Sequence, residues 1–360
     1  MPSKTTVSIV GEDFHINGQP TYAGRTWQGR RVEGLLMNSR MVQATFDDLN
    51  PETRSLWMTP WGAFDAEQNT DEFVAHLPAY RAAGLLSVIV NLQGGSPQGY
   101  SRQQPWHNSA FEADGSLRPN YMNRMAKVLD HCDALGMAPM LSLFYFGQDH
   151  RLADESAVLR ATDAVVDWLI ERGDRHVLIE ICNEADIRYT HPILKHDRVH
   201  ELVRRVQQRS EGKLDTPAGR LLASVSMSGG NLMPDACVDA SDFLLLHGNG
   251  VKQPDRIREM VDQTRAQATC HGQPILFNED DHFDFDQDDY NMLAALDRHA
   301  GWGYFDYRME GEGFEQGYQS VPVDWSINSP RKQAFFGKLA EVTGQSDATS
   351  AGCCGCSREA

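Results

Sequence analysis

Short apolar runs alternate with helical patterns along most of this chain. The runs are almost entirely apolar, which is typical of parallel strands buried on both faces rather than strands with one face in water. They lie at residues 85–90, 137–146, 177–182, 221–226, 242–247, 275–278 and 303–307. Apolar positions at helical spacing predict helices at residues 70–84, 121–135, 157–170, 199–206, 257–265, 290–299 and 332–342.

This alternation predicts a single α/β domain, a (β/α)8 TIM barrel, which needs about 250 residues plus insertions. The chain has 360 residues, so a second full domain is not required. We expect a short N-terminal β-hairpin and lead-in at residues 1–40 covering one end of the barrel, the barrel itself at 41–344, and a disordered tail at 345–360. An open doubly wound sheet is the alternative, but no glycine-rich phosphate loop follows the first strand.

Turn and capping signals give the local assignments. An Asn-Gly pair at residues 17–18 predicts the hairpin turn. Residues 41–46 are preferred over residues 22–27 as the first barrel strand, because two aspartates then follow its carboxyl end. Thr70 is expected to cap the first long helix. The short gap before the strand at 242–247 predicts a short or irregular fifth crossover.

Two of the apolar runs end in an amide followed by a carboxylate. One run leads to Asn183 and Glu184, and the other leads to Asn278 and Glu279. The two glutamates are separated by about three βα units of roughly 30 residues each, which places them on strands four and seven. The ends of these strands face each other across the mouth of a barrel, where ligands bind. The sequence therefore predicts that the two carboxylates converge.

Two converging carboxyl groups in different environments suit the cleavage of a glycosidic bond. One protonates the leaving oxygen, and the other meets the positive charge that develops at the sugar carbon. A separation of about 5–5.5 Å allows direct attack and retention of configuration, whereas about 6.5–9.5 Å leaves room for a water and gives inversion. An asparagine before each glutamate can orient the carboxylate or bind a sugar hydroxyl.

The paired motifs resemble the signature of the clan A glycoside hydrolases, the cellulase-like retaining barrel enzymes. The resemblance covers roughly residues 14–344 and implies that Glu184 is the general acid/base and Glu279 the nucleophile. Many clan members end strand six in His-x-Tyr, whereas this chain has His247-Gly-Asn249. The strand-eight tryptophan of the clan has no clear match, because Trp302 lies at the start of that strand. Because of these departures, the resemblance does not identify the sugar that the protein binds.

Other residues are expected to contact the substrate because they lie at strand ends or in the aromatic loop at residues 94–119. For single aromatic residues and for His247, packing in the core is the competing interpretation. The expected substrate-binding residues are Asn91, Trp106, Tyr145, Asn183, His247, Asn249, Asn278 and Tyr307.

The formal net charge of −17 argues against nucleic acid and anionic membranes as partners and favours a neutral or cationic small ligand. No apolar run is long enough to span a membrane, and the N-terminus lacks a signal-peptide pattern, so a cytoplasmic location is expected unless a leader has been removed. Cysteines scattered singly through predicted core elements favour a reducing compartment. The oligomeric state is left open.

No cofactor or metal is expected. The acidic run at residues 280–289 lacks the glycine and closing glutamate of a calcium loop, and His191, His196 and His200 do not form a zinc motif. Cys353, Cys354 and Cys356 lack a partner cluster. A retaining glycosidase acting on a neutral glycoside or oligosaccharide is thus favoured. A non-catalytic carbohydrate-binding barrel and a metal-dependent barrel enzyme are the alternatives.

Overall fold

The computed structural model describes residues 2–345. The predicted tail beyond residue 345, with Cys353, Cys354 and Cys356, lies outside the described residues. Within this range eight parallel strands follow one another in chain order. They are β6 (Asn38–Arg40), β7 (Ser87–Asn91), β8 (Met140–Phe144), β9 (Leu178–Cys182), β10 (Leu222–Ser224), β11 (Leu244–His247), β12 (Ile275–Glu279) and β13 (Gly303–Tyr304).

Hydrogen-bonded ladders join these strands in the spatial order β10-β9-β8-β7-β6-β13, and β11 pairs with β12. The first and last strands are neighbours, because Gly303 pairs with Asn38. Isolated parallel bridges join the β12 segment to the β13 segment. Between β10 and β11 the described backbone forms no ladder, and a hydrogen bond from Asp242 N to Ala223 O (3.0 Å) spans the junction. The strands therefore follow the (β/α)8 order, with no ladder between β10 and β11 and only isolated bridges between the β12 and β13 segments.

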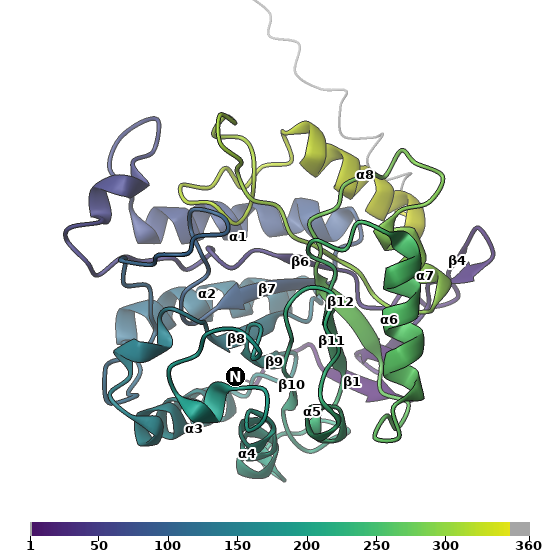
Figure 1. Cartoon of the computed structure of the whole chain (residues 1–360), viewed down its shortest axis with the longest axis horizontal. Helices are drawn as coiled ribbons and strands as arrows, with labels where there is room; N and C mark the ends of the chain where they lie inside the picture. The colour runs from purple at the N-terminus through teal and green to yellow at the C-terminus, as the bar shows by residue number, and fades with distance from the viewer. Residues whose placement is uncertain (1, 346–360) are drawn as a thin grey trace, which may run out of the picture.

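Helices surround the strands (Figure 1). Their apolar faces pack on the sheet, and α8 lies beside α1, where Tyr80 stacks on Phe336 with ring centroids 5.1 Å apart. The fifth crossover has only six helical residues, which confirms the prediction of a short one. The helices are α1 (Ala66–Ala82), α2 (Pro119–Ala134), α3 (Glu155–Arg172), α4 (His200–Ser210), α5 (Asp235–Ala240), α6 (Pro254–Ala266), α7 (Asn291–Asp297) and α8 (Pro330–Thr343), with short 3-10 turns η1 (Arg54–Trp57), η2 (Asp149–Arg151) and η3 (Pro192–Leu194).

Local chemistry sets the ends of the helices. In α3 the Asp154 side chain accepts a hydrogen bond from Ala157 N at 2.7 Å, and the helix ends at Gly173 with φ of 72°. Glycine adopts this left-handed conformation without the steric cost of a Cβ. The predicted cap of α1 was wrong, because Asp65 caps this helix and Thr70 lies inside it. The Thr70 hydroxyl instead donates to Ala44 O at 2.8 Å.

The prediction of the first barrel strand was also wrong. Neither residues 22–27 nor residues 41–46 form it, because β6 consists of Asn38, Ser39 and Arg40. All three side chains are buried although they are polar. Their hydrogen-bonding partners come from distant strands, so the burial of this strand leaves no local apolar pattern in the sequence.

The N-terminal segment forms a three-stranded antiparallel sheet of β1 (Val7–Val10), β2 (Asp13–Ile16) and β3 (Gln19–Pro20). A separate small pair follows, β4 (Thr26–Trp27) and β5 (Arg30–Arg31). Phe14 of β2 belongs to an apolar cluster that includes residues from the amino-terminal ends of the barrel strands, and its ring lies 5.9 Å from that of Phe243.

The four cysteines in the described range, Cys132, Cys182, Cys237 and Cys270, form no disulfide with one another. Burial raises the pKa of the Cys132 and Cys182 thiols, so both thiols stay protonated and pack as small apolar groups. No helix in residues 2–345 combines the length and the apolar character needed to cross a membrane.

Candidate active site

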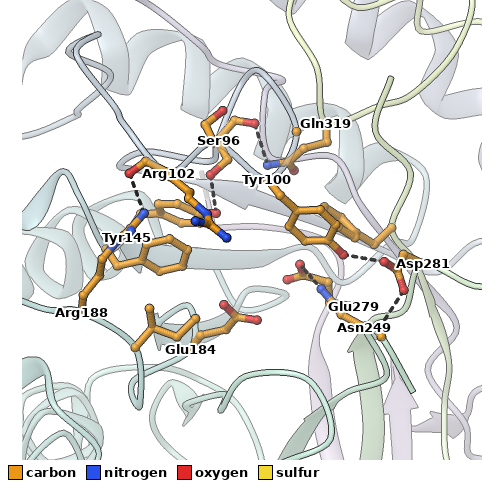
Figure 2. Close-up of a pocket in the computed structure, with 16 residues that line it drawn as sticks. Ser96, Tyr100, Arg102, Tyr145, Glu184, Arg188, Asn249, Glu279, Asp281 and Gln319 are labelled. Carbon is orange, nitrogen blue, oxygen red and sulfur yellow. Dashed lines mark hydrogen bonds between the residues drawn. The ribbon is translucent and has the colours of Figure 1, made fainter. Parts of the chain in front are cut away.

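A pocket of about 490 Å³ lies at the carboxyl ends of the parallel strands (Figure 2). Both predicted catalytic glutamates line it, Glu184 after β9 and Glu279 at the end of β12. They are nearly buried, with 8% and 5% of their surface exposed. The other lining residues include Tyr100, Tyr145, Asn249 and Asp281.

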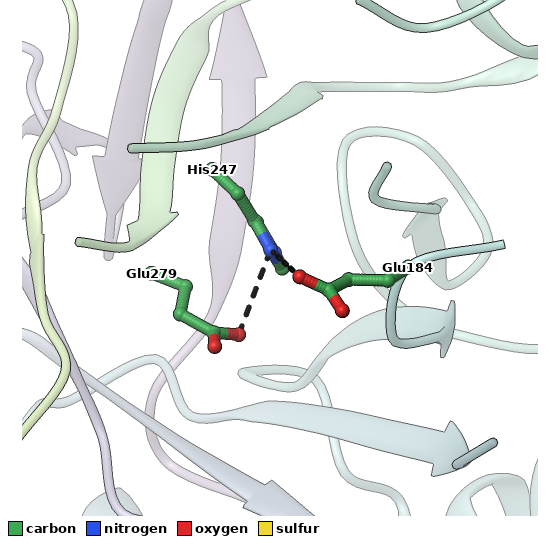
Figure 3. Close-up of side chains that lie close together, drawn as sticks. All are labelled: Glu184, His247 and Glu279. Carbon is green, nitrogen blue, oxygen red and sulfur yellow. Dashed lines mark hydrogen bonds and ion pairs between the residues drawn. The ribbon is translucent and has the colours of Figure 1, made fainter. Parts of the chain in front are cut away.

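His247, at the end of β11, brings the two glutamates together (Figure 3). Its Nδ1 lies 3.1 Å from Glu184 Oε1 and 3.6 Å from Glu279 Oε2. One carboxylate oxygen of Glu184 lies within 4.8 Å of one of Glu279. The imidazole Nε2 is buried and has no hydrogen-bond partner in residues 2–345. The ring therefore interacts with the carboxylates through one nitrogen.

The backbone at Glu184 positions its side chain beyond the sheet. Glu184 has φ of 55°, a left-handed conformation that a residue with a Cβ rarely adopts. The Ser226 hydroxyl accepts a hydrogen bond from Glu184 N at 3.1 Å, and Ala185 N donates to Ser226 O at 3.0 Å. These contacts hold the turn that follows β9, and strained backbone of this kind is often found at functional sites.

A buried arginine that the sequence analysis did not identify connects the site to the barrel interior. Arg40 of β6 is 1% exposed, and its Nε lies 3.0 Å from Glu279 Oε2. Its Nη1 lies 3.3 Å from Glu180 Oε2, and its Nη2 donates to Asn183 Oδ1. One guanidinium thus contacts two carboxylates and an amide. No sequence signal pointed to it, because a single arginine in a polar stretch is usually a surface residue.

Glu180 is the second unpredicted member of this network, and it is completely buried in the middle of β9. Ser226 Oγ donates to it at 2.7 Å and Asn278 Nδ2 at 3.0 Å. Burial acts to raise the pKa of Glu180, but the charges of Arg40 and His247 together with hydrogen bonds hold it below the ordinary value. Glu180 is therefore an ionised partner for Arg40 inside the barrel.

Burial and neighbouring charges affect the pKa values of Glu279 and His247 in different ways. Burial raises the pKa of Glu279 above that of an ordinary glutamate, although Arg40 and His247 oppose the shift. Burial alone would lower the pKa of His247, but the two carboxylates outweigh it and raise the pKa of the imidazole. Both shifts arise because charged groups are buried together, and perturbed pKa values of this kind are common at functional sites.

Asn249 and Tyr145, two of the expected substrate-binding residues, line the pocket. Asn249 Nδ2 donates to Glu279 Oε1 at 2.7 Å, so this amide contacts the carboxylate at the position where the clan pattern has tyrosine. The Tyr145 hydroxyl lies 2.9 Å from Ser96 Oγ. Tyr100, from the aromatic loop at residues 94–119, forms a further contact, with its hydroxyl donating to Asp281 Oδ2 at 2.6 Å.

The other expected substrate-binding residues do not line this pocket. Asn183 and Asn278 are buried and hydrogen-bond to Arg40 and Glu180, so they support the network beneath the glutamates. The Asn91 side chain is buried and donates to Gln93 O at 3.3 Å.

Two aromatic residues from that set also lie outside the lining. Trp106 is buried in an apolar cluster, with its ring 5.5 Å from that of Trp57. Tyr307 packs against the lining residue Tyr100, with ring centroids 4.7 Å apart.

Two clusters in the described residues bring ligand atoms close enough for a cation. Glu184, His247 and Glu279 form one, and Asp280, Asp281 and His282 form the other. In the first cluster the Arg40 guanidinium already supplies a positive charge to Glu279. In the second, nitrogen donors of Trp302 (3.0 Å) and Asn291 (3.0 Å) point at Asp280 Oδ2. Both arrangements favour protein donors over a metal ion.

No family model matches the sequence, and no curated protein matches it in sequence. Solved structures do match. A glycoside hydrolase family 5 protein from Bacteroides vulgatus superimposes with a TM-score of 0.56 at 14% identity, over 93% of this chain and 70% of its own. The endo-1,4-beta-mannanase of Rhizomucor miehei gives 0.55 at 11% identity, over 96% and 99%. A GH5-4 broad specificity endoglucanase from Bacteroides salanitronis gives 0.52 at 12%, over 87% and 92%. The resemblance to glycoside hydrolases is thus confirmed at the level of the fold.

Proposed function

We propose that this protein is a retaining glycoside hydrolase, with Glu279 as nucleophile and Glu184 as general acid/base. The observation that carries the proposal is the approach of the two carboxylates to within 4.8 Å in an open pocket. This proximity favours the shorter carboxyl separation, about 5–5.5 Å, at which a carboxylate attacks directly, over the longer one of about 6.5–9.5 Å at which a water attacks.

In the first step, a Glu279 oxygen attacks the anomeric carbon while Glu184 gives its proton to the leaving oxygen. The glycosidic bond breaks, and a glycosyl ester forms on Glu279. In the second step, Glu184 removes a proton from water, which attacks the same carbon and releases Glu279 as a carboxylate. Two inversions at one carbon give net retention.

The surroundings of Glu279 suit a nucleophile. Arg40 and Asn249 contact different oxygens of this carboxylate, at 3.0 and 2.7 Å, and so fix its orientation. They also stabilise its negative charge, both before attack and when the ester breaks down. Glu184 contacts neither group, and its carboxylate instead lies beside His247 Nδ1 at 3.1 Å. The two glutamates therefore have the unequal environments that separate their roles.

Hydrolysis of β-linked oligosaccharides tests the proposal, and the names of the similar structures suggest glucan and mannan substrates. Proton NMR of the first-formed product should show the β-anomer before mutarotation. Replacing either Glu279→Gln or Glu184→Gln should lower kcat by roughly 10³-fold or more, because each side chain takes part in bond making or breaking.

Glu259→Gln is a matched control, because Glu259 is an exposed glutamate on α6 that pairs with Arg256 at 3.4 Å. It should hydrolyse the substrate at the wild-type rate. Near-normal turnover in both Glu184→Gln and Glu279→Gln would refute the assignment, and an α-anomer as first product would refute retention.

A further inference from the structure

One wall of the pocket carries two arginines, Arg102 from the loop after β7 and Arg188 from the segment after β9. Figure 2 shows them together on the Tyr145 side, with Asn249 and Asp281 on the opposite side. Both are exposed to solvent. The pocket therefore has a cationic wall opposite a side that carries one carboxylate, Asp281, in addition to the two glutamates.

The structure joins these arginines into one unit. Arg188 Nη2 donates to Arg102 O at 2.7 Å, which ties the segment after β9 to the loop after β7. The Arg188 guanidinium also lies 5.7 Å from the centroid of the Phe146 ring, a cation–π contact that holds it in place. A guanidinium has five N–H donors, so most of those on Arg188 are free for a ligand.

The two pocket arginines differ from most arginines of this protein, whose net charge is −17. Most arginines in residues 2–345 form ion pairs with carboxylates, such as Arg204 with Asp239 and Arg258 with Asp289, each at 2.6 Å. Within residues 2–345, neither pocket arginine forms such a pair. Charges more than a screening length apart interact weakly in salt, so these two arginines act on a ligand beside them more strongly than the distant surface carboxylates do.

We propose that Arg102 and Arg188 bind an anionic substituent of the saccharide, either a carboxylate or a sulfate ester. The proposal rests on the proposed glycosidase function and replaces the neutral substrate expected from net charge with an acidic one. A planar guanidinium forms paired hydrogen bonds with such oxyanions. Arg188 lies four residues after Glu184 and lines the same pocket, so we place the anionic group on the side of the proposed proton donor and the leaving group.

Matched pairs of β-linked oligosaccharides test this inference. One pair compares a uronic-acid oligosaccharide with its carboxyl-reduced form, and the other compares a sulfated oligosaccharide with its desulfated form. The wild-type protein should prefer the anionic member of at least one pair by about tenfold or more in kcat/KM. The pair that shows the preference identifies the source of the charge. Equal kcat/KM within both pairs would overturn the inference.

The double variant Arg102→Gln/Arg188→Gln should reduce this preference to near unity, mainly by raising KM for the anionic member. Arg204→Gln removes one exposed positive charge far from the pocket and should keep the wild-type preference. Added salt should raise KM for the anionic member only. A preference that survives in the double variant would overturn the assignment to these arginines.

Calorimetric titration of the Glu279→Gln protein with the same pairs separates the two proposals. Tighter binding of an anionic member, lost in the triple variant with both arginines replaced, supports the arginine site even if wild-type protein hydrolyses nothing. Absence of hydrolysis would then refute the glycosidase proposal alone. Equal binding of anionic and neutral members would refute the arginine site.

Discussion

The two ends of the parallel strands are built from opposite chemistry. At the amino-terminal ends, Leu86, Leu178 and Leu276 pack in an apolar cluster with Phe14 of the N-terminal sheet. At the carboxyl ends, Arg40 contacts Glu279 above and Glu180 within the barrel. Burying apolar surface stabilises the fold, whereas burying charges costs solvation free energy that ion pairing barely offsets. We infer that the first end maintains stability and that the second is retained for chemistry.

Replacing the buried arginine should have the largest effect. Arg40→Met leaves Glu180 and Glu279 without their cation, so the free energy of unfolding should fall by about 3–5 kcal/mol. The kcat/KM should also fall by roughly 100-fold, because the proposed nucleophile loses a fixed positive charge. Denaturant unfolding and steady-state kinetics measure the two effects. Adding Glu180→Gln should restore part of the stability and none of the activity. An unchanged free energy of unfolding in Arg40→Met would contradict the view that Glu180 and Glu279 need a buried cation.

A substitution at the opposite end should separate stability from chemistry. Leu178→Ala removes buried methyl groups from the apolar cluster and should lower the free energy of unfolding by about 2–5 kcal/mol. The pH dependence of kcat/KM should not change. Leu178 packs in the apolar cluster with Phe14, at the end of the strands opposite to the two glutamates. A shifted pH profile in this variant would show that the two ends are coupled.

Asn249 provides a test confined to the polar end. Asn249→Ala removes the hydrogen bond to Glu279 Oε1, which favours the ionised carboxylate. Hydrogen bonds to charged groups contribute about 1.5–3 kcal/mol. The pKa of Glu279 should therefore rise, and the acidic limb of kcat/KM should move up by roughly one pH unit. Asn249→Asp should move it further, since it adds a negative charge. If the acidic limb does not move, the hydrogen bond from Asn249 does not influence the pKa of Glu279.

The smallest expected effect is the position of the acidic limb of kcat/KM in the wild-type protein. As the proposed nucleophile, Glu279 must be ionised, so kcat/KM should fall as the pH falls through the pKa of this group. Burial raises that pKa above the ordinary glutamate value of 4.5, and the acidic limb should lie correspondingly higher. An acidic limb at or below 4.5 would show that Arg40 outweighs burial.

The sequence predicted those parts of the fold whose pattern is local. The strands that contain Leu178 and Leu276 are mostly apolar, and a carboxylate marks each carboxyl end: Glu184 follows β9, and Glu279 is the last residue of β12. The strand at residues 38–40 was missed because its buried side chains are polar. Arg40 is buried only because Glu180 lies 140 positions further along the chain, and such a pairing has no signature in either segment.

The same limit applies to the candidate site. Glu184, Glu279 and Asn249 were identified because they follow or end strands at one edge of the sheet. The roles expected for Asn183 and Asn278 rested on their adjacency to the glutamates, but both side chains bind residues of the buried network instead. Arg102 and Arg188 lie in loops, where no periodic pattern shows which residues will face a pocket.

The contact of Arg40 with two carboxylates also bears on biosynthesis. Arg40 leaves the ribosome first, Glu180 follows, and Glu279 appears only when most of the chain has been made. Glu180 can therefore neutralise the guanidinium in a nascent chain that ends before β12, and the half-built sheet need not enclose a lone cation. We expect chains with Glu180→Gln to depend more strongly on chaperones during translation than the mature protein's stability would suggest.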